Sequence, residues 1–236
     1  MIYGLIFSAG NQKRFELETP KALIPLGSKP LLKHNMEHLY PYCNRIFVVC
    51  SYLNKDYFED YDKIVITSGK GCGDAVLSAL DELPLIKGDK CFIQWGDSYC
   101  NFEVVKRTFM QGITSDCVVI PCETVDNPYV QLEQFGDRIS VKFSKYNEPT
   151  NKGFHDLSLF FGDACYIRDC LEEYKRQIFK NSNYVHKHGN EMEFLDLFNE
   201  VDMKGTIIPI TYHSCFSFNK MSEFKDSTCI LDDDTL

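Results

Sequence analysis

Several features that define whole classes of protein are missing from this sequence of 236 residues. No apolar run approaches the length of a membrane-spanning helix, so a membrane protein is not expected. No Cys-x-x-Cys pair occurs among the 11 cysteines, so a zinc ribbon is not supported. Acidic residues outnumber basic residues, which gives a net charge of −9. This charge argues against a nucleic-acid surface, which needs a basic face to neutralise phosphates.

No Gly/Ser-rich or Pro-rich linker interrupts the chain, so one domain over residues 1–236 is expected. The hydrophobic content of 44% and the charged content of 25% are those of an ordinary globular protein. No signal peptide is expected before the first apolar run, which predicts a cytoplasmic protein. Five cysteines in or beside apolar runs are then predicted to be small buried hydrophobic residues: Cys43, Cys50, Cys91, Cys117 and Cys122.

Short β-branched and aromatic runs alternate with segments whose apolar residues recur at helical spacing. The predicted strands are 2–7, 45–50, 63–67, 91–95 and 117–121, and the predicted helices are 30–39, 73–83 and 102–113. This alternation predicts an α/β fold with a mostly parallel sheet covered by helices on both faces. Ligands of such sheets bind beyond the carboxyl ends of the strands.

The pattern changes after residue 125. A hairpin is predicted from residues 129–135 and 139–143, with Gly136 and Asp137 in the turn. Further strands are predicted at 157–161 and 206–210, and helices at 164–179, 191–198 and 220–225. His186 and His188 lie in a polar loop that could suggest a metal site, although a solvated loop is the commoner setting.

The first predicted strand runs directly into the loop "SAGNQKR", which ends in two cations. Gly10 has no Cβ, so a ligand can approach the backbone closely there. Successive N–H groups at such a turn bind anions, and Arg14 with Lys21 could neutralise a triphosphate. The alternative is a surface loop with two solvated cations.

The run "LIFSAGNQKRF" followed by "TPKALIPLGSKPLL" resembles the N-terminal signature of the sugar-phosphate and MobA-like nucleotidyltransferases. The residues that match the family pattern are Gly10, Arg14, Pro20, Lys21, Lys29 and Pro30, whereas Gln12 replaces a second loop glycine. The resemblance implies a Rossmann-like, GT-A-type three-layer sandwich with a mixed, mostly parallel sheet. It also implies a nucleotide-binding half at 1–125 and an acceptor-binding half at 126–236. The nucleotide loop would comprise Ser8, Ala9, Gly10, Asn11, Gln12 and Lys13.

Three further segments match the family in order and type. "GKGCGDA" resembles the segment that receives the nucleobase, which implies nucleotide contacts for Gly71, Gly73 and Asp74. "CFIQWGDSYC" resembles the strand-Gly-Asp element whose aspartate, here Asp97, binds Mg²⁺. "CFSFNKMSEFKD" resembles the element of the second metal ligand, here Asn219. Taken singly, these residues also suit a glycine-rich turn and helix N-caps.

The resemblance implies that an acceptor phosphate attacks the α-phosphorus of a nucleoside triphosphate and that pyrophosphate leaves. Arg14 and Lys21 would hold the triphosphate, with Mg²⁺ on Asp97 and Asn219. Either Lys142 or Lys145 would face the acceptor phosphate, and Glu193 is a candidate acceptor-binding acid. The edge of a solvated strand is the alternative setting for the two lysines.

The compact chain resembles most the cytidylyltransferase branch, so CTP is favoured over UTP. The expected acceptor is a small phosphate such as phosphocholine or phosphoglutamine, for surface-polysaccharide decoration, and a homodimer is left open. A sugar-1-phosphate nucleotidyltransferase is the first alternative, and a non-catalytic nucleotide sensor is the second. A glycosyltransferase is disfavoured because Gly96-Asp97-Ser98 lacks the second acid of an Asp-x-Asp motif.

Overall fold

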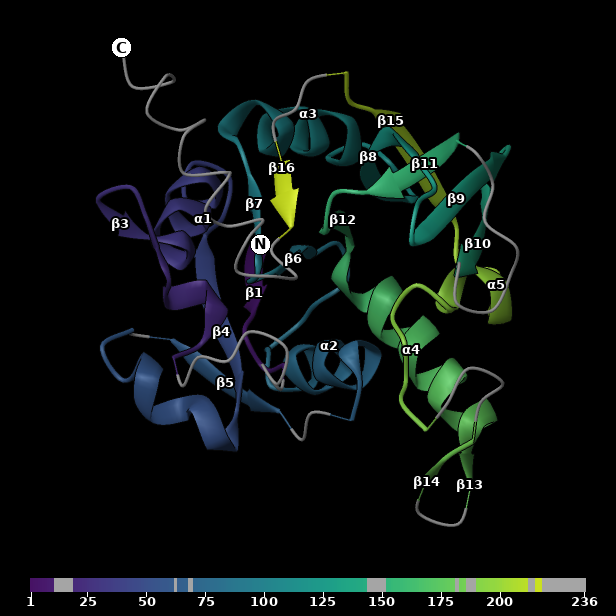
Figure 1. Cartoon of the computed structure of the whole chain (residues 1–236). Helices are drawn as coiled ribbons and strands as arrows, with labels where there is room; N and C mark the ends of the chain where they lie inside the picture. Colours follow the sequence, from purple (N-terminus) through teal and green to yellow (C-terminus); the bar gives the residue numbers. More distant parts are fainter. Residues whose placement is uncertain are drawn as a thin grey trace.

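A mixed β-sheet forms the centre of the molecule (Figure 1). The structure is a computed structural model that describes residues 1–10, 19–61, 63–67, 70–143, 152–180, 183–185, 190–211 and 215–217. Four strands of the first half pair in parallel in the order β6-β1-β4-β5, namely Lys90–Trp95, Ile2–Phe7, Arg45–Ser51 and Ile64–Thr67. Because these strands share one direction, their carboxyl ends lie along one edge of the sheet.

Strands from the second half extend the sheet beyond β6. Strand β12 (Leu159–Asp163) is antiparallel to both β6 and β8 (Val118–Asp126), and β15 (Gly205–Pro209) pairs in parallel with β8. Beyond β8 lie β11 (Lys152–Asp156), β9 (Val130–Phe135) and β10 (Arg138–Phe143). The resulting 10-stranded sheet confirms the expected mixed, mostly parallel α/β fold.

Helices cover both faces of the sheet (Figure 1). One apolar cluster joins the sheet to α1 (Leu31–Leu39) and α3 (Phe102–Gly112). The opposite cluster joins it to α2 (Cys72–Asp81), α4 (Ala164–Ile178) and α5 (Leu197–Glu200). Strand β1 contributes Leu5 and Phe7 to one cluster and Ile6 to the other, as the alternation of side chains along a strand requires. The four helices predicted at 30–39, 73–83, 102–113 and 164–179 are therefore confirmed.

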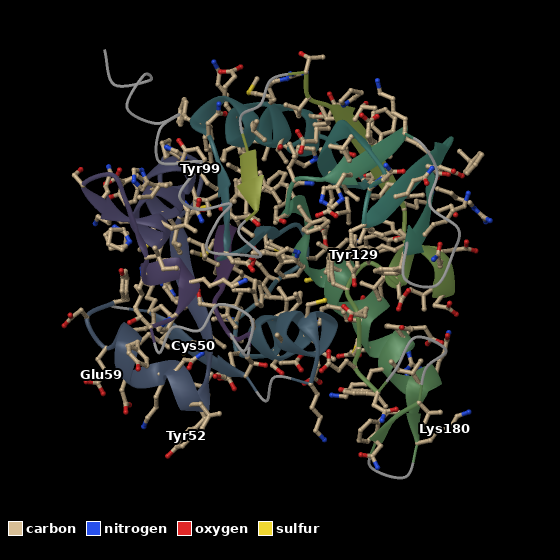
Figure 2. The ribbon with its side chains drawn as sticks, viewed as in Figure 1. Cys50, Tyr52, Glu59, Tyr99, Tyr129 and Lys180 are labelled. Atoms are coloured by element: carbon tan, nitrogen blue, oxygen red, sulfur yellow. The ribbon has the colours of Figure 1, made fainter. Side chains whose placement is uncertain are left out.

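Smaller elements complete the fold. A 3₁₀ segment, η1 (Lys21–Leu23), precedes the short pair β2 (Pro25–Leu26) and β3 (Lys29–Pro30), and another, η2 (Tyr52–Phe58), follows β4. Strands β7 (Ser98–Cys100) and β16 (Cys215–Ser217) pair with each other, as do β13 (Phe179–Lys180) and β14 (Asn183–Tyr184). Figure 2 shows that Tyr52 at the start of η2 and Glu59 just after its end reach outward, whereas Cys50 in β4 is buried.

Nine of the cysteines within the described residues are free thiols: Cys43, Cys50, Cys72, Cys91, Cys100, Cys117, Cys122, Cys165 and Cys170. Cys50, Cys91 and Cys122 are buried, as predicted, while Cys43 and Cys117 are partly buried. Burial raises the pKa of Cys43 to about 12, which keeps this thiol protonated. No helix in the described ranges is long and apolar enough to cross a membrane.

The predicted helix at 191–198 is wrong, because only Leu197–Glu200 is helical. The backbone at residues 192–194 bonds to a loop of the first half instead: the Gly73 N–H donates to the Met192 carbonyl, and the Met192 N–H donates to the Lys70 carbonyl. Tertiary contacts thus override a helical pattern. The predicted helix at 220–225 lies outside the described residues.

The strand predicted at 157–161 is displaced, because β12 begins at Leu159. Ser158 has a φ of 62° and its carbonyl accepts a hydrogen bond from the Trp95 N–H, so the chain turns there. This turn separates β12 from β11, which the sequence pattern did not reveal. Strand β11 pairs with β8 and ends in Asp156, whose carboxylate accepts from the Ser158 N–H.

We predict that Phe161→Ala destabilises the protein by about 3 to 5 kcal/mol, the usual cost of truncating a buried phenylalanine. Phe161 is fully buried, with its ring 4.3 Å from Phe92 and 5.9 Å from Phe109 between centroids. The free energy of unfolding in urea measures the effect. Phe135→Ala is the control, because Phe135 is 64% exposed, and it should change that free energy by less than about 0.5 kcal/mol.

Candidate active site

The carboxyl ends of β1 and β6 bring two predicted loops together. The Gly96 N–H donates to the Phe7 carbonyl over 2.8 Å, and the Ser8 N–H donates to the Val49 carbonyl in β4 over 2.7 Å. A Cβ added to Gly96 would lie 2.7 Å from the Phe7 carbonyl oxygen and 2.5 Å from the Ser8 hydroxyl oxygen, so only glycine fits. Ser8 and its neighbours therefore lie directly beside the Gly96-Asp97 turn, at the edge where ligands of parallel sheets bind.

Lys21 and Asp97 meet at this edge. The Lys21 ammonium donates to Asp97 Oδ2 over 3.2 Å, although the two residues are 76 positions apart in the sequence. Lys21 is the first residue of η1. Ile24 follows η1 directly, and its carbonyl accepts a hydrogen bond from the Leu31 N–H at the start of α1. The Asp97 side chain is 37% exposed and that of Lys21 14% exposed. An ion pair at this exposure stabilises the fold by less than about 1 kcal/mol, so stability is not its main contribution.

Strand β16 runs next to the Asp97 turn. Ser217 is paired with Ser98 in the antiparallel β7–β16 register, so the end of β16 is adjacent to Asp97. Tyr99 anchors β7 by packing its ring against His34 and His38 of α1, in the region labelled in Figure 2. Eight residues singled out in the sequence lie outside the described residues: Asn11, Gln12, Lys13, Arg14, Lys145, His186, His188 and Asn219.

The loop at residues 70–73, here called the glycine loop, lies against residues 192–194. Gly71 has a φ of 102°, and a Cβ there would lie 2.5 Å from the Met192 carbonyl oxygen. The Gly73 N–H donates to that oxygen over 2.7 Å. The Cys72 thiol donates to Glu193 Oε2 over 3.1 Å and its sulfur accepts from the Phe194 N–H over 3.1 Å. The sequence assigned Glu193 to the acceptor, but its carboxylate contacts the predicted nucleobase loop.

Asp74 binds side chains of the second half. Its buried carboxylate accepts a hydrogen bond from the Tyr184 hydroxyl and lies 3.6 Å from the Lys175 ammonium. Burial and this hydrogen bond raise the pKa of Tyr184 above its usual value, so the hydroxyl remains a donor. The contacts join the first turn of α2 to α4 and β14, immediately after the glycine loop.

Lys142 lies on the outer strands of the sheet. Its ammonium donates to Glu133 Oε1 of β9 over 2.8 Å, and the Gln131 side-chain amide donates to the same oxygen over 2.9 Å. Gln131 and Lys142 are directly opposite each other in the β9–β10 register. Lys142 therefore belongs to a polar cluster on the outer strands β9 and β10, which are not neighbours of β6 in the sheet.

The Asp97 carboxylate has the chemistry of a Mg²⁺ ligand. It is a hard, partly exposed oxygen donor at a strand end, which suits Mg²⁺ bound together with phosphates. No group of three or more His, Cys, Asp or Glu side chains suited to a metal occurs within the described ranges. A Mg²⁺ ion that keeps water and phosphate oxygens needs only one or two protein oxygens, so the residue fits.

Gln94 is a residue of interest that the sequence pattern did not single out. This side chain is fully buried in β6, and both of its amide atoms lack a hydrogen-bond partner among the residues described. A buried amide without a partner costs free energy, so native proteins rarely retain one. The available signal was one amide inside the otherwise apolar strand "CFIQW".

A comparison with known families matches residues 4–145 to the family described as the MobA-like NTP transferase domain. A bifunctional sugar-1-phosphate nucleotidylyltransferase/acetyltransferase from Sulfurisphaera tokodaii is 37% identical over 119 residues, which is 46% of this chain and 29% of that protein. The chain spans between a quarter and a third of the length of the curated relatives it matches.

Two solved structures share the fold over nearly the whole chain. HddC from Yersinia pseudotuberculosis superposes with a TM-score of 0.70 and 17% identity, covering 98% of this chain and 100% of its own. CTP:phosphocholine cytidylyltransferase (LicC) from Streptococcus pneumoniae superposes with a TM-score of 0.68 and 16% identity, covering 98% and 99%. At these identities the likeness establishes the fold alone.

We predict that Gly71→Ala destabilises the protein by about 3 kcal/mol. The cost combines a backbone conformation unfavourable for alanine with the overlap against Met192. Thermal and urea unfolding measure the change. Gly88→Ala is the matched control, because Gly88 also has a positive φ (+92°) but a Cβ added there would meet no atom within 4 Å. It should cost only about 1 kcal/mol, and equal losses for the two variants would contradict the tight docking of the glycine loop.

Proposed function

The chain belongs to the family of MobA-like NTP transferase domains, and we propose that it transfers CMP from CTP to a small phosphorylated acceptor and releases pyrophosphate. The observation that supports this most directly is the contact between Lys21 and Asp97. A cation for phosphates and an oxygen ligand for Mg²⁺ meet where a parallel sheet binds ligands. The proposed setting is the cytoplasm, in the decoration of a capsule or other surface polysaccharide.

In this proposal, the Lys21 ammonium binds the triphosphate and offsets the charge that develops on departing pyrophosphate. Ser8, Ala9 and Gly10 bring backbone close to the phosphates, and Arg14 supplies a second cation. Asp97, with Asn219, would hold a Mg²⁺ ion, which neutralises charge on the phosphates when bound. The protein's own contribution is to align the acceptor phosphate with the α-phosphorus, because phosphoryl-type transfer depends chiefly on positioning and charge.

The acceptor is proposed to be phosphocholine or phosphoglutamine, with Lys142 or Lys145 facing its phosphate. The fold shared with a phosphocholine cytidylyltransferase agrees with this class of acceptor. The names of the curated relatives favour the alternative, a sugar 1-phosphate activated by UTP, dTTP or GTP. Both alternatives use the same reaction at the α-phosphorus, so one experiment separates them.

Pyrophosphate release provides that experiment. CTP, UTP, dTTP, ATP and GTP are each combined with phosphocholine, phosphoglutamine and several sugar 1-phosphates in the presence of Mg²⁺. Release that depends on CTP and a small non-sugar phosphate is the expected result. Release with a sugar 1-phosphate would support the alternative, nucleotide binding without release would support a sensor, and no nucleotide binding would overturn the proposal.

We predict that Asp97→Asn lowers kcat by at least about a hundredfold while the protein stays folded, because the amide removes the charge expected to hold Mg²⁺. Thermal unfolding should change little, since the exposed pair with Lys21 contributes less than about 1 kcal/mol. Asp56→Asn, at a carboxylate whose side chain is 76% exposed, is the control and should keep full activity. An active, folded Asp97→Asn variant would remove Asp97 from the mechanism.

A further inference from the structure

Glu193 lies at the interface between the two halves of the chain. Its carboxylate accepts from the Cys72 thiol of the glycine loop over 3.1 Å, while the flanking residues bond to the same loop through their backbones. Glu193 is partly exposed, so a ligand at the loop can reach it. The arrangement fixes a carboxylate from the second half beside the loop after β5, at the same sheet edge as Asp97.

The Cys72 thiol keeps this carboxylate in position. Burial and the nearby charge of Glu193 raise the pKa of Cys72 well above its usual value. The thiol therefore stays protonated and remains a donor. Because a carboxylate has two oxygens and accepts several hydrogen bonds at once, Glu193 can accept from a ligand in addition to its protein partners, Cys72 among them.

Several backbone donors around the glycine loop are already used. The Gly73 N–H donates to the Met192 carbonyl, and the Met192 N–H donates to the Lys70 carbonyl. The Phe194 N–H donates to the Cys72 sulfur. These three groups cannot also donate to a base without breaking a bond. The Glu193 carboxylate only accepts, so it adds a hydrogen-bond acceptor to this interface.

We propose that Glu193 reads the nucleobase by accepting a hydrogen bond from its exocyclic amino group, and so selects cytosine over uracil. Cytosine carries an amino donor at C4, where the uracil-type bases carry a carbonyl acceptor. A carboxylate facing that position attracts the amino group and repels the carbonyl oxygen. The inference rests on the proposed function and on the resemblance of the glycine loop to the family's nucleobase segment. It assigns Glu193 to the nucleotide rather than to the acceptor.

The first test compares equilibrium binding of CTP and UTP by calorimetry for the full chain and for Glu193→Gln. The native protein should prefer CTP by about tenfold or more, of the order expected for one specific base contact. An amide can donate to the uracil carbonyl, so Glu193→Gln should lower the preference at least fivefold, largely through tighter UTP binding. Glu191→Gln, an exposed acid two residues earlier, is the matched control and should keep the preference.

Two variants at Cys72 test the same inference even if Glu193→Gln does not fold. Cys72→Ala removes the donor that fixes Glu193 and should also reduce the preference for CTP, whereas Cys72→Ser restores a donor and should retain it. Circular dichroism checks that each variant is folded. If Glu193→Gln does not fold, the contrast between Cys72→Ala and Cys72→Ser decides the question.

The outcomes separate this inference from the proposed function. Turnover that prefers UTP, or a CTP preference unchanged in both Glu193→Gln and Cys72→Ala, would overturn the role of Glu193 while the transferase function stands. A higher acceptor KM in Glu193→Gln with an unchanged CTP to UTP ratio would return Glu193 to the acceptor. Failure of the native protein to bind either nucleotide would overturn the function itself.

Discussion

The close docking of the glycine loop on residues 192–194 is the constraint on which the candidate site depends. Gly71 and Gly73 lie so near the Met192 backbone that no Cβ fits at either position. Backbone hydrogen bonds in both directions join the two segments. Because one segment follows β5 and the other precedes α5, this contact joins the two halves of the chain at the edge where strands of the parallel sheet end.

The same edge explains why the charged residues of the site are compatible with the fold. Lys21 and Asp97 form a partly exposed pair that contributes little to stability. The interior beneath them is held instead by two apolar clusters on opposite faces of the sheet. The proposed chemistry and the stability of the fold thus depend on different residues.

Much of the architecture could be predicted from periodicity. Strand β1 and helices α1, α2, α3 and α4 lie within a residue or two of the predicted bounds, since alternating and helical apolar patterns reflect local geometry. Prediction failed at residues 191–198 and at β11. In the first case distant backbone groups compete for the hydrogen bonds that a helix would use. In the second, the pattern predicted only the strand at 157–161, and the chain turns at Ser158 between β12 and the unpredicted β11.

The candidate site also divides into features that the sequence pattern predicts and features that tertiary contacts decide. The sequence by itself determined which residue types are available, because the glycines, Lys21 and Asp97 stand in a recognisable order along the chain. Only the tertiary structure decided which of them meet: Lys21 reaches Asp97 across 76 positions, and Glu193 reaches Cys72 across 121. The physical reason is that strand pairing and loop docking set distances in space, whereas residue patterns report only local backbone preference and burial.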